Sequence, residues 1–401
     1  MLDVDTYDKA ENVAAERYPN RILQAFYPEM FATLGYPARV KRNDQLWRYI
    51  DVMHETRTHF NLEYLLHGMT PEEFELFKKV TKIVDSHTTA QFGMRAHPTA
   101  ALLRAIHVLR LIKIVTGSAR PTVLEIGPGC GYLAVLLVME GYPYVGTDVV
   151  QAFYLYQNHM LSLVAKNLRE LVTEDADIMT VGQPEPGTAI HIPWWKWVTL
   201  TPDKIKLSAG IMTSNHVLCE MHPSSMAYLT VVAGRILANH PGGGKVVFDN
   251  WGYDLLHSHE TVAREFAKRG LHVCHDEDAM TAMVLDENAR QQLVQASPSP
   301  DPWLSVRRQV AEWLGYVPPL KRTAIRMVNF WQQRRPRPAP VFTTSNAPHP
   351  LSRQLTSGRK EVIAAATIQE AEVHAFLASH FGDRPPQHSD EAFLDLIGTR
   401  Y

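Results

Sequence analysis

Cysteine is scarce in this chain of 401 residues. The three cysteines, Cys130, Cys219 and Cys274, lie far apart, and no CxxC spacing occurs. A disulfide framework and a structural zinc site are therefore not expected. The same usage predicts a reducing, cytoplasmic compartment.

Long apolar runs and an excess of one charge are also missing. No window approaches the roughly 18 uninterrupted apolar residues of a membrane span, and residues 1–20 are polar and acidic, unlike a secretory signal. The 40 Lys and Arg residues against 42 Asp and Glu residues leave a formal charge of −2. That charge is too small to attract nucleic acid or an anionic membrane, so a small molecule is the expected partner.

The rest of the composition is that of a soluble globular protein. Hydrophobic residues make up 45% of the chain and charged residues 20%, a balance that argues against wholesale disorder. The length predicts about two or three domains. No internal repeat is detectable.

The stretch PTVLEIGPGCGYLAVLLVMEGYPYVGTDV, residues 121–149, carries the clearest pattern. It predicts a buried strand at 122–126, a glycine turn, an apolar helix at about 132–140 and a second strand at 144–149. This order is typical of the first half of a nucleotide-binding α/β layer.

The turn itself indicates a ligand. Gly127, Gly129 and Gly131 allow positive φ and close approach of a ligand to the main chain, and the next helix begins with unpaired N–H groups. Asp148 follows about 20 residues later, where a parallel strand delivers a carboxylate to the same crevice within reach of a ribose diol. A ligand that contains a nucleoside is expected, against the alternative of a glycine-rich turn that binds nothing.

The spacing of the glycines distinguishes between cofactors that contain a nucleoside. A dinucleotide fingerprint needs a glycine where this chain has Tyr132. The pattern from Glu125 to Gly131, with Asp148 after the next strand, instead resembles motif I of the class I S-adenosylmethionine-dependent methyltransferases over roughly residues 118–290. The resemblance implies that the three glycines hold the methionine moiety, Glu125 lies beneath it near the ammonium, and Asp148 binds the ribose hydroxyls.

The resemblance also implies an architecture. We expect an α/β fold, a Rossmann-like methyltransferase sheet at 118–290, with a helical domain at 1–117 and an extension at 291–401. In this family such N-terminal helices often form a lid over the acceptor or a homodimer surface. The extension contains an expected tryptophan-containing helix at 303–314, a Pro- and Arg-rich linker at 331–350, and a further helical region after it.

Two strong helices are expected in the N-terminal part. Residues 70–87 have Thr70 as an N-cap and Pro71 at the first helical position, and residues 98–117 have apolar residues at helical intervals. Residues 87–100 between them read as a helix connection or as a loop over the cofactor.

No residue is assigned to the binding of the adenine ring of the cofactor. Residues 151–171 predict a helix, and residues 189–200 predict a third strand interrupted by Pro193. Trp194 or Trp195 is able to stack on adenine, although core packing is the commoner role of adjacent tryptophans.

Candidate catalytic residues follow the fourth and fifth strands, expected at 211–215 and 245–248. Residues just beyond the carboxyl ends of such strands face the ligand crevice. Asn215 is counted with the cofactor-binding residues. The catalytic candidates are imidazole and carboxylate side chains able to remove a proton: His216, Glu220, His222 and His257.

Two features bear on metal. Asp249 and Asn250 resemble one half of the magnesium site of catechol-type O-methyltransferases, but the expected partner carboxylate after the fourth strand is missing, so no metal is assigned. The cluster His275–Asp278 contains metal-binding residue types and reads better as a solvated hairpin turn.

The function expected from these patterns is methyl transfer from S-adenosylmethionine to a small polar acceptor. The segment NHVLCEM resembles a sequence after strand four of bacterial sugar O-methyltransferases, which favours a hydroxyl on a sugar-like or natural-product intermediate. The alternatives are N- or C-methylation of a small metabolite, an NAD-dependent oxidoreductase, and a binding protein without turnover.

Overall fold

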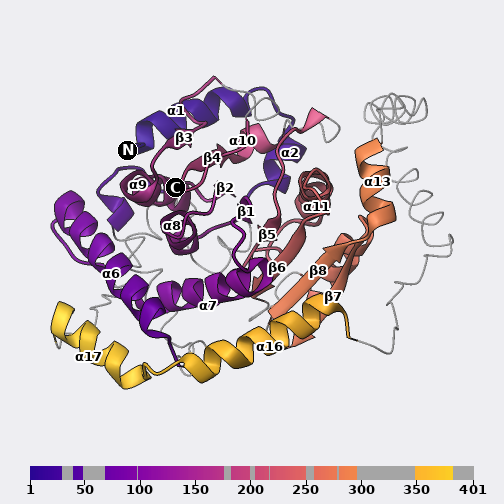
Figure 1. The fold of residues 1–401 in the computed structure, drawn as a ribbon. Helices are drawn as coiled ribbons and strands as arrows, with labels where there is room; N and C mark the ends of the chain where they lie inside the picture. Colours follow the sequence, from indigo (N-terminus) through magenta and orange to yellow (C-terminus); the bar gives the residue numbers. More distant parts are fainter. Residues whose placement is uncertain are drawn as a thin grey trace.

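The computed structural model describes residues 1–28, 39–47, 68–96, 98–175, 182–198, 204–215, 217–249, 257–277, 280–295 and 348–382 (Figure 1). Its centre is an eight-stranded sheet in the order β3-β4-β2-β1-β5-β6-β8-β7. The strands are β1 (Val123–Ile126), β2 (Tyr144–Asp148), β3 (Leu168–Glu170), β4 (Ala189–Pro193), β5 (Ile211–Thr213), β6 (Lys245–Asp249), β7 (Leu271–Glu277) and β8 (Met280–Leu285). All neighbours pair in parallel except β8, which is antiparallel to both β6 and β7. The predicted Rossmann-like sheet is confirmed.

The strand order reverses at β1. The chain adds β2 on one side of β1 and later adds β5 on the other. In open α/β sheets, ligands bind outside the carboxyl ends of the strands at such a reversal. The loops after β1, β2 and β5 meet at this place.

Helices cover both faces of the sheet. They are α1 (Val4–Ala15), α2 (Asn20–Ala25), α6 (Pro71–Phe92), α7 (Thr99–Thr116), α8 (Tyr132–Met139), α9 (Gln151–Val164), α10 (Trp194–Trp197), α11 (Pro223–Ala238), α12 (His259–Ala267), α13 (Glu287–Gln295), α16 (Pro350–Ala365) and α17 (Glu370–Phe381). Successive strand residues point to opposite faces, so Val123 joins one buried cluster and Leu124 the other. The first cluster includes side chains of α6, α7, α8 and α9, and the second those of α11 and α12.

The helices α6 and α7 form as their sequences predict. Thr70 and Glu73 make a reciprocal capping box before α6, with Pro71 at the first helical position. The helix continues to Phe92 and ends at Gly93, with φ 70°, so it includes the first part of the expected connection. Arg110 of α7 donates two hydrogen bonds to Glu73, at 2.8 and 2.6 Å, which ties the two helices together.

Three expectations are corrected in detail. The helix expected at 151–171 ends at Val164, and a short edge strand, β3, follows it. Pro193 ends β4 instead of interrupting it, and α10 starts at the next residue. His275 is not in a solvated turn, because it is buried in β7 and its Nδ1 lies 2.9 Å from Ser352 Oγ.

The C-terminal helices lie against the N-terminal ones. The helix α16 packs beside α7 and β7, and α17 follows it along the outside of the domain (Figure 1). The expected helix at 303–314 and the Pro- and Arg-rich stretch up to residue 347 lie outside the described residues. Among the helices that are described, none combines the length and apolar character needed to cross a membrane.

Candidate cofactor site

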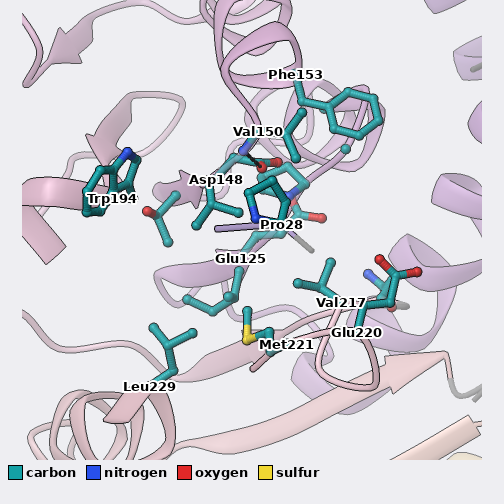
Figure 2. Close-up of a pocket in the computed structure, with 18 of the residues that line it drawn as sticks. Pro28, Glu125, Asp148, Val150, Phe153, Trp194, Val217, Glu220, Met221 and Leu229 are labelled. Atoms are coloured by element: carbon teal, nitrogen blue, oxygen red, sulfur yellow. Dashed lines mark hydrogen bonds between the residues drawn. The ribbon is translucent and has the colours of Figure 1, made fainter. Parts of the chain in front are cut away.

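A cavity opens at the carboxyl edge of the sheet where the strand order reverses. It encloses about 1330 Å³ of empty space, including its opening to solvent. Its lining comes from the loops after β1, β2 and β5, from α7, α10 and α11, and from residues 25–28. In the view of Figure 2, Glu125 and Asp148 lie between Trp194 on one side and Glu220 on the other.

The glycine turn after β1 forms one wall of the cavity. Gly127, Gly129 and Gly131 have φ of 66°, 60° and 74°, a region that other residues rarely adopt. A Cβ on Gly127 would lie 2.4 Å from Val217, and one on Gly131 would lie 2.9 Å from Gln157. A Cβ on Gly129 would meet nothing within 4 Å. The turn therefore packs tightly behind Gly127 and Gly131 and leaves bare backbone at Gly129.

Asp148 ends β2 and lines the same cavity. Its Oδ1 accepts the N–H of Val150 at 2.9 Å, and its Oδ2 accepts Nε2 of Gln157 at 2.8 Å. Burial raises the pKa of Asp148 to about 6, although these hydrogen bonds favour the charged form. Each carboxylate oxygen has lone-pair capacity beyond this one hydrogen bond, which suits the two hydroxyls of a ribose.

Glu125 lies in β1 beneath the glycine turn. It is 2% exposed, and its Oε2 accepts the hydroxyl of Tyr144 at 2.9 Å. Burial raises the pKa of Glu125 to about 8, and the nearby Asp148 adds to the shift. A carboxyl group in this state is suited to a cationic ligand group, because a positive charge would stabilise its ionised form.

Aromatic side chains line the end of the cavity beyond Asp148. Trp194 faces the cavity, donates from Nε1 to Oε1 of Glu11 at 2.6 Å, and stacks on Phe26 with ring centroids 6.0 Å apart. Trp195 instead packs edge-on against Tyr7 in the core. Of the two tryptophans, only Trp194 is placed to contact a purine ring here.

Residues after β5 line the opposite end. Glu220 lines the cavity, and so does His222, which is the N-cap of α11. Nδ1 of His222 accepts the N–H of Ser224 at 3.2 Å, so the neutral ring carries its proton on Nε2. In this tautomer Nε2–H of His222 is able to donate a hydrogen bond, whereas an ionised Glu220 carboxylate only accepts.

The other predicted residues of this edge have structural contacts. Asn215 lines the cavity, accepts the N–H of Asp249 at 3.0 Å and donates to Thr213 at 3.1 Å. His257 is not part of the cavity lining, and its Nε2 lies 2.8 Å from the carbonyl oxygen of Met221. The predicted catalytic residue His216 lies outside the described residues.

Asp249, which the sequence suggested as one half of a metal site, forms an ion pair instead. Arg104 of α7 lines the cavity and donates from Nε to Oδ2 of Asp249 at 2.8 Å, with both side chains buried. Asn250 lies outside the described residues. Within the described residues, no group of three His, Cys, Asp or Glu side chains is placed to hold a metal ion.

Several residues of the site had no recognisable signal in the sequence. Gln157 bridges Asp148 and the carbonyl of Gly129, yet it occurs in an ordinary helical stretch. Arg104 lies in the apolar pattern of α7, and residues 25–28 reach the cavity from far along the chain. Each owes its place to tertiary packing, which a single sequence does not display.

Comparisons with known proteins give the following matches. No protein-family model and no curated protein matches the chain. Among solved structures, it is similar to a magnesium protoporphyrin IX methyltransferase from Synechocystis PCC 6803 with bound S-adenosylmethionine, at 10% identity, over 52% of this chain and 97% of that one, with a TM-score of 0.29. It is similar to a TehB-like S-adenosylmethionine-dependent methyltransferase from Corynebacterium glutamicum at 13% identity, over 45% and 87% of the two chains, with a TM-score of 0.31.

A third match is an N-methyltransferase from Bradyrhizobium japonicum in complex with S-adenosylhomocysteine, at 13% identity, over 46% of this chain and 88% of that one, with a TM-score of 0.29. Similarity at this level does not identify the ligand or the reaction of this chain. Both therefore rest on the residues of the cavity.

Proposed function

We propose that this protein is an S-adenosylmethionine-dependent methyltransferase that acts on a small polar acceptor. The observation that carries the proposal is the placement of Glu125, the positive-φ glycine turn and Asp148 around one cavity at the reversal of strand order. These groups suit an ammonium, a close-lying amino-acid backbone and a ribose diol. Trp194 offers a ring to the adenine.

The cavity residues fit this cofactor, which when bound supplies a methyl group already activated on a sulfonium. The protein then has to align an acceptor atom with that methyl group and exclude water. Glu220 lies across the cavity from Trp194 (Figure 2), and His222 also lines the cavity. Glu220 would accept the proton of an acceptor hydroxyl, while Nε2–H of His222 would hold an acceptor oxygen.

The proposed acceptor group is a hydroxyl. A hydroxyl of a sugar-like or natural-product intermediate is favoured, because a carboxylate base and a hydrogen-bond donor that line the same cavity suit O-methylation. N- or C-methylation is the alternative.

A cytoplasmic location is supported by Cys130, Cys219 and Cys274, which form thiols and not disulfides. A homodimer through the N-terminal helices is proposed from the resemblance alone.

An NAD-dependent oxidoreductase is the competing enzyme class. Tyr132, which stands where the dinucleotide fingerprint needs a glycine, is buried at the start of α8, and its hydroxyl lies 3.0 Å from that of Tyr156. The large side chain fills the place where close packing of a dinucleotide-binding helix uses glycine.

Isothermal titration with S-adenosylhomocysteine and, separately, with NAD tests the cofactor. We expect the first to bind, NAD to show no heat of binding, and Asp148→Ala to weaken binding by at least about tenfold. Absence of S-adenosylhomocysteine binding, or an unchanged affinity in Asp148→Ala, would rule the cofactor out.

A second test separates an enzyme from a binding protein. With a labelled methyl donor and a panel of hydroxylated acceptors, Glu220→Gln should reduce transfer by about 100-fold while S-adenosylhomocysteine affinity stays within about twofold. Loss of affinity and transfer together would place Glu220 in cofactor binding and not in catalysis.

A further inference from the structure

A relay of hydrogen-bonded polar side chains runs from the cavity to the edge strand β3 and consists of Asp148, Gln157, His191 and Glu170. Gln157 of α9 lies between Asp148 and His191 of β4, and His191 contacts Glu170 of β3. The distances are 2.8 Å from Gln157 Nε2 to Asp148, 3.0 Å from Gln157 Oε1 to His191 Nε2, and 2.8 Å from His191 Nδ1 to Glu170. Glu170 is thereby connected to the proposed ribose-binding carboxylate through two side chains.

The orientation of the Gln157 amide is fixed by its partners. One end of the amide lies 2.7 Å from the carbonyl oxygen of Gly129 and 2.8 Å from Asp148 Oδ2. A carbonyl oxygen accepts only, and so does a carboxylate, so this end must be the NH₂ group. The amide oxygen therefore faces Nε2 of His191, and that ring nitrogen must carry a proton.

The second ring nitrogen of His191 must carry a proton as well. The carboxylate of Glu170 accepts from Tyr154 Oη at 2.6 Å, from Val172 N at 3.0 Å and from Asn158 Nδ2 at 2.8 Å. The amide of Asn158 is itself oriented, because its oxygen accepts the N–H of Leu2 at 2.7 Å. Surrounded by donors, Glu170 is an ionised acceptor, and Nδ1 of His191 is its fourth donor.

The surroundings of His191 are compatible with a positive ring. The carboxylates that face it are Glu170 and, beyond Gln157, Asp148, and the ring of Tyr154 stacks on it with centroids 3.7 Å apart. Burial would raise the pKa of Glu170, but the charge and hydrogen bond of His191 and the bond from Tyr154 bring it below its usual value.

We propose that Gln157 and a doubly protonated His191 are positioning residues that hold the Asp148 carboxylate and the Gly129 carbonyl in the geometry the cofactor requires. Without the Nε2 proton of His191, the amide oxygen of Gln157 would face a lone pair, and turning the amide over would place an oxygen against Asp148. The inference rests on the proposed function, because the affected property is cofactor affinity.

The isosteric change Gln157→Glu tests the relay. It keeps the side-chain shape and an acceptor for His191 but replaces the donor that faces Asp148 and Gly129. Affinity for S-adenosylhomocysteine should fall at least about tenfold. In the double variant Gln157→Glu with Asp148→Asn, a donor faces the new carboxyl group, so the loss should be smaller than the sum of the two single changes.

The matched control is Tyr156→Phe. It removes one buried hydroxyl contact from the same helix, to Tyr132, without touching the relay. Its affinity should stay within about twofold of wild type. Thermal unfolding of each variant separates loss of fold from loss of binding.

Histidine-selective ¹⁵N NMR tests the proton assignment without any cofactor. In neutral buffer, His191 should show two protonated ring nitrogens, with its signal identified by its disappearance in His191→Gln or its shift in Gln157→Glu. A singly protonated His191, or full affinity in Gln157→Glu beside normal wild-type binding, overturns the relay alone. Failure of wild-type protein to bind S-adenosylhomocysteine overturns the proposed function and the relay's role with it.

Discussion

Stability and ligand binding compete at Glu125. Burial gives this carboxyl group a pKa of about 8 against an ordinary value of 4.5, so at neutral pH it is mainly protonated. A bound ammonium would favour its ionised form, and binding near pH 7 would therefore release a proton.

The sign of the pH effect follows from this shift. Because the folded pKa is raised, the stabilising contribution of Glu125 is complete below about pH 4.5 and is lost as pH rises through about 8. We expect Glu125→Gln to reduce the fall in Tm of the ligand-free protein between about pH 6 and pH 8.5, and to weaken S-adenosylhomocysteine binding by about tenfold or more. Thermal unfolding at both pH values and calorimetry measure the two effects. An unchanged pH dependence of Tm together with unchanged affinity would contradict this role.

Gly129 allows a test of the bare backbone in the turn. Gly129→Ala places a methyl group in open space on the cavity wall and strains a positive-φ position. The control is Gly141→Ala, since Gly141 has φ 82° and equally open surroundings in the turn between α8 and β2. Both changes should cost about 1 kcal/mol of stability, but only Gly129→Ala should reduce cofactor affinity. Equal affinities in calorimetry would show that nothing lies against Gly129.

At the scale of elements, the strongest sequence patterns gave the right structure. The strands β1, β2 and β6 are short buried runs bounded by turn residues, and the helix α6 starts at a proline in the first turn. Their signals are local, so one sequence was enough to predict them. The glycine turn and Asp148 were predictable for the same reason.

What one sequence could not display is pairing between distant residues. The short edge strand β3 lacks a period long enough to recognise, and the role of Glu170 depends on donors from α9, β4 and the backbone of Val172. Arg104 and Asp249 are separated by 145 residues. The site residues that were missed depend on such long-range contacts.

The ion pair between α7 and the end of β6 is a testable link between elements. Arg104→Met leaves the buried Asp249 carboxylate without this cation and should cost about 3–5 kcal/mol in unfolding free energy. The comparison is Arg264→Met, which removes an exposed pair with Glu260 at 2.8 Å and should cost less than about 1 kcal/mol. Urea denaturation measures both. Similar losses of unfolding free energy in the two variants would show that the Arg104–Asp249 pair does not stabilise the contact between α7 and β6.

At the scale of the whole molecule, the N-terminal segment contributes to the site. The N–H of Leu2 donates to Asn158, Tyr18 donates to the carbonyl of Trp195 at 2.9 Å, and Glu11 accepts from Trp194. Residues 25–28 complete the cavity wall. The first helices therefore cover the cavity end that contains Trp194.

Because the N-terminal segment covers one end of the cavity, its backbone amides should be protected from hydrogen exchange when a ligand binds. Binding of S-adenosylhomocysteine should slow hydrogen exchange in the glycine turn and also in residues 25–28, because both line the same cavity. The helix α17, on the outside of the domain, serves as the control and should not change (Figure 1). Mass-spectrometric exchange with and without ligand measures this. Protection limited to the glycine turn would show that the N-terminal segment takes no part in binding.

A crystal structure of the protein with S-adenosylhomocysteine would show directly which groups surround the methyl donor. We expect the ribose hydroxyls on the Asp148 carboxylate, the amino-acid part against Gly129 with its ammonium near Glu125, and the sulfur facing the side of the cavity lined by Glu220 (Figure 2). A ligand bound away from Asp148, or with its sulfur turned from Glu220, would contradict this arrangement.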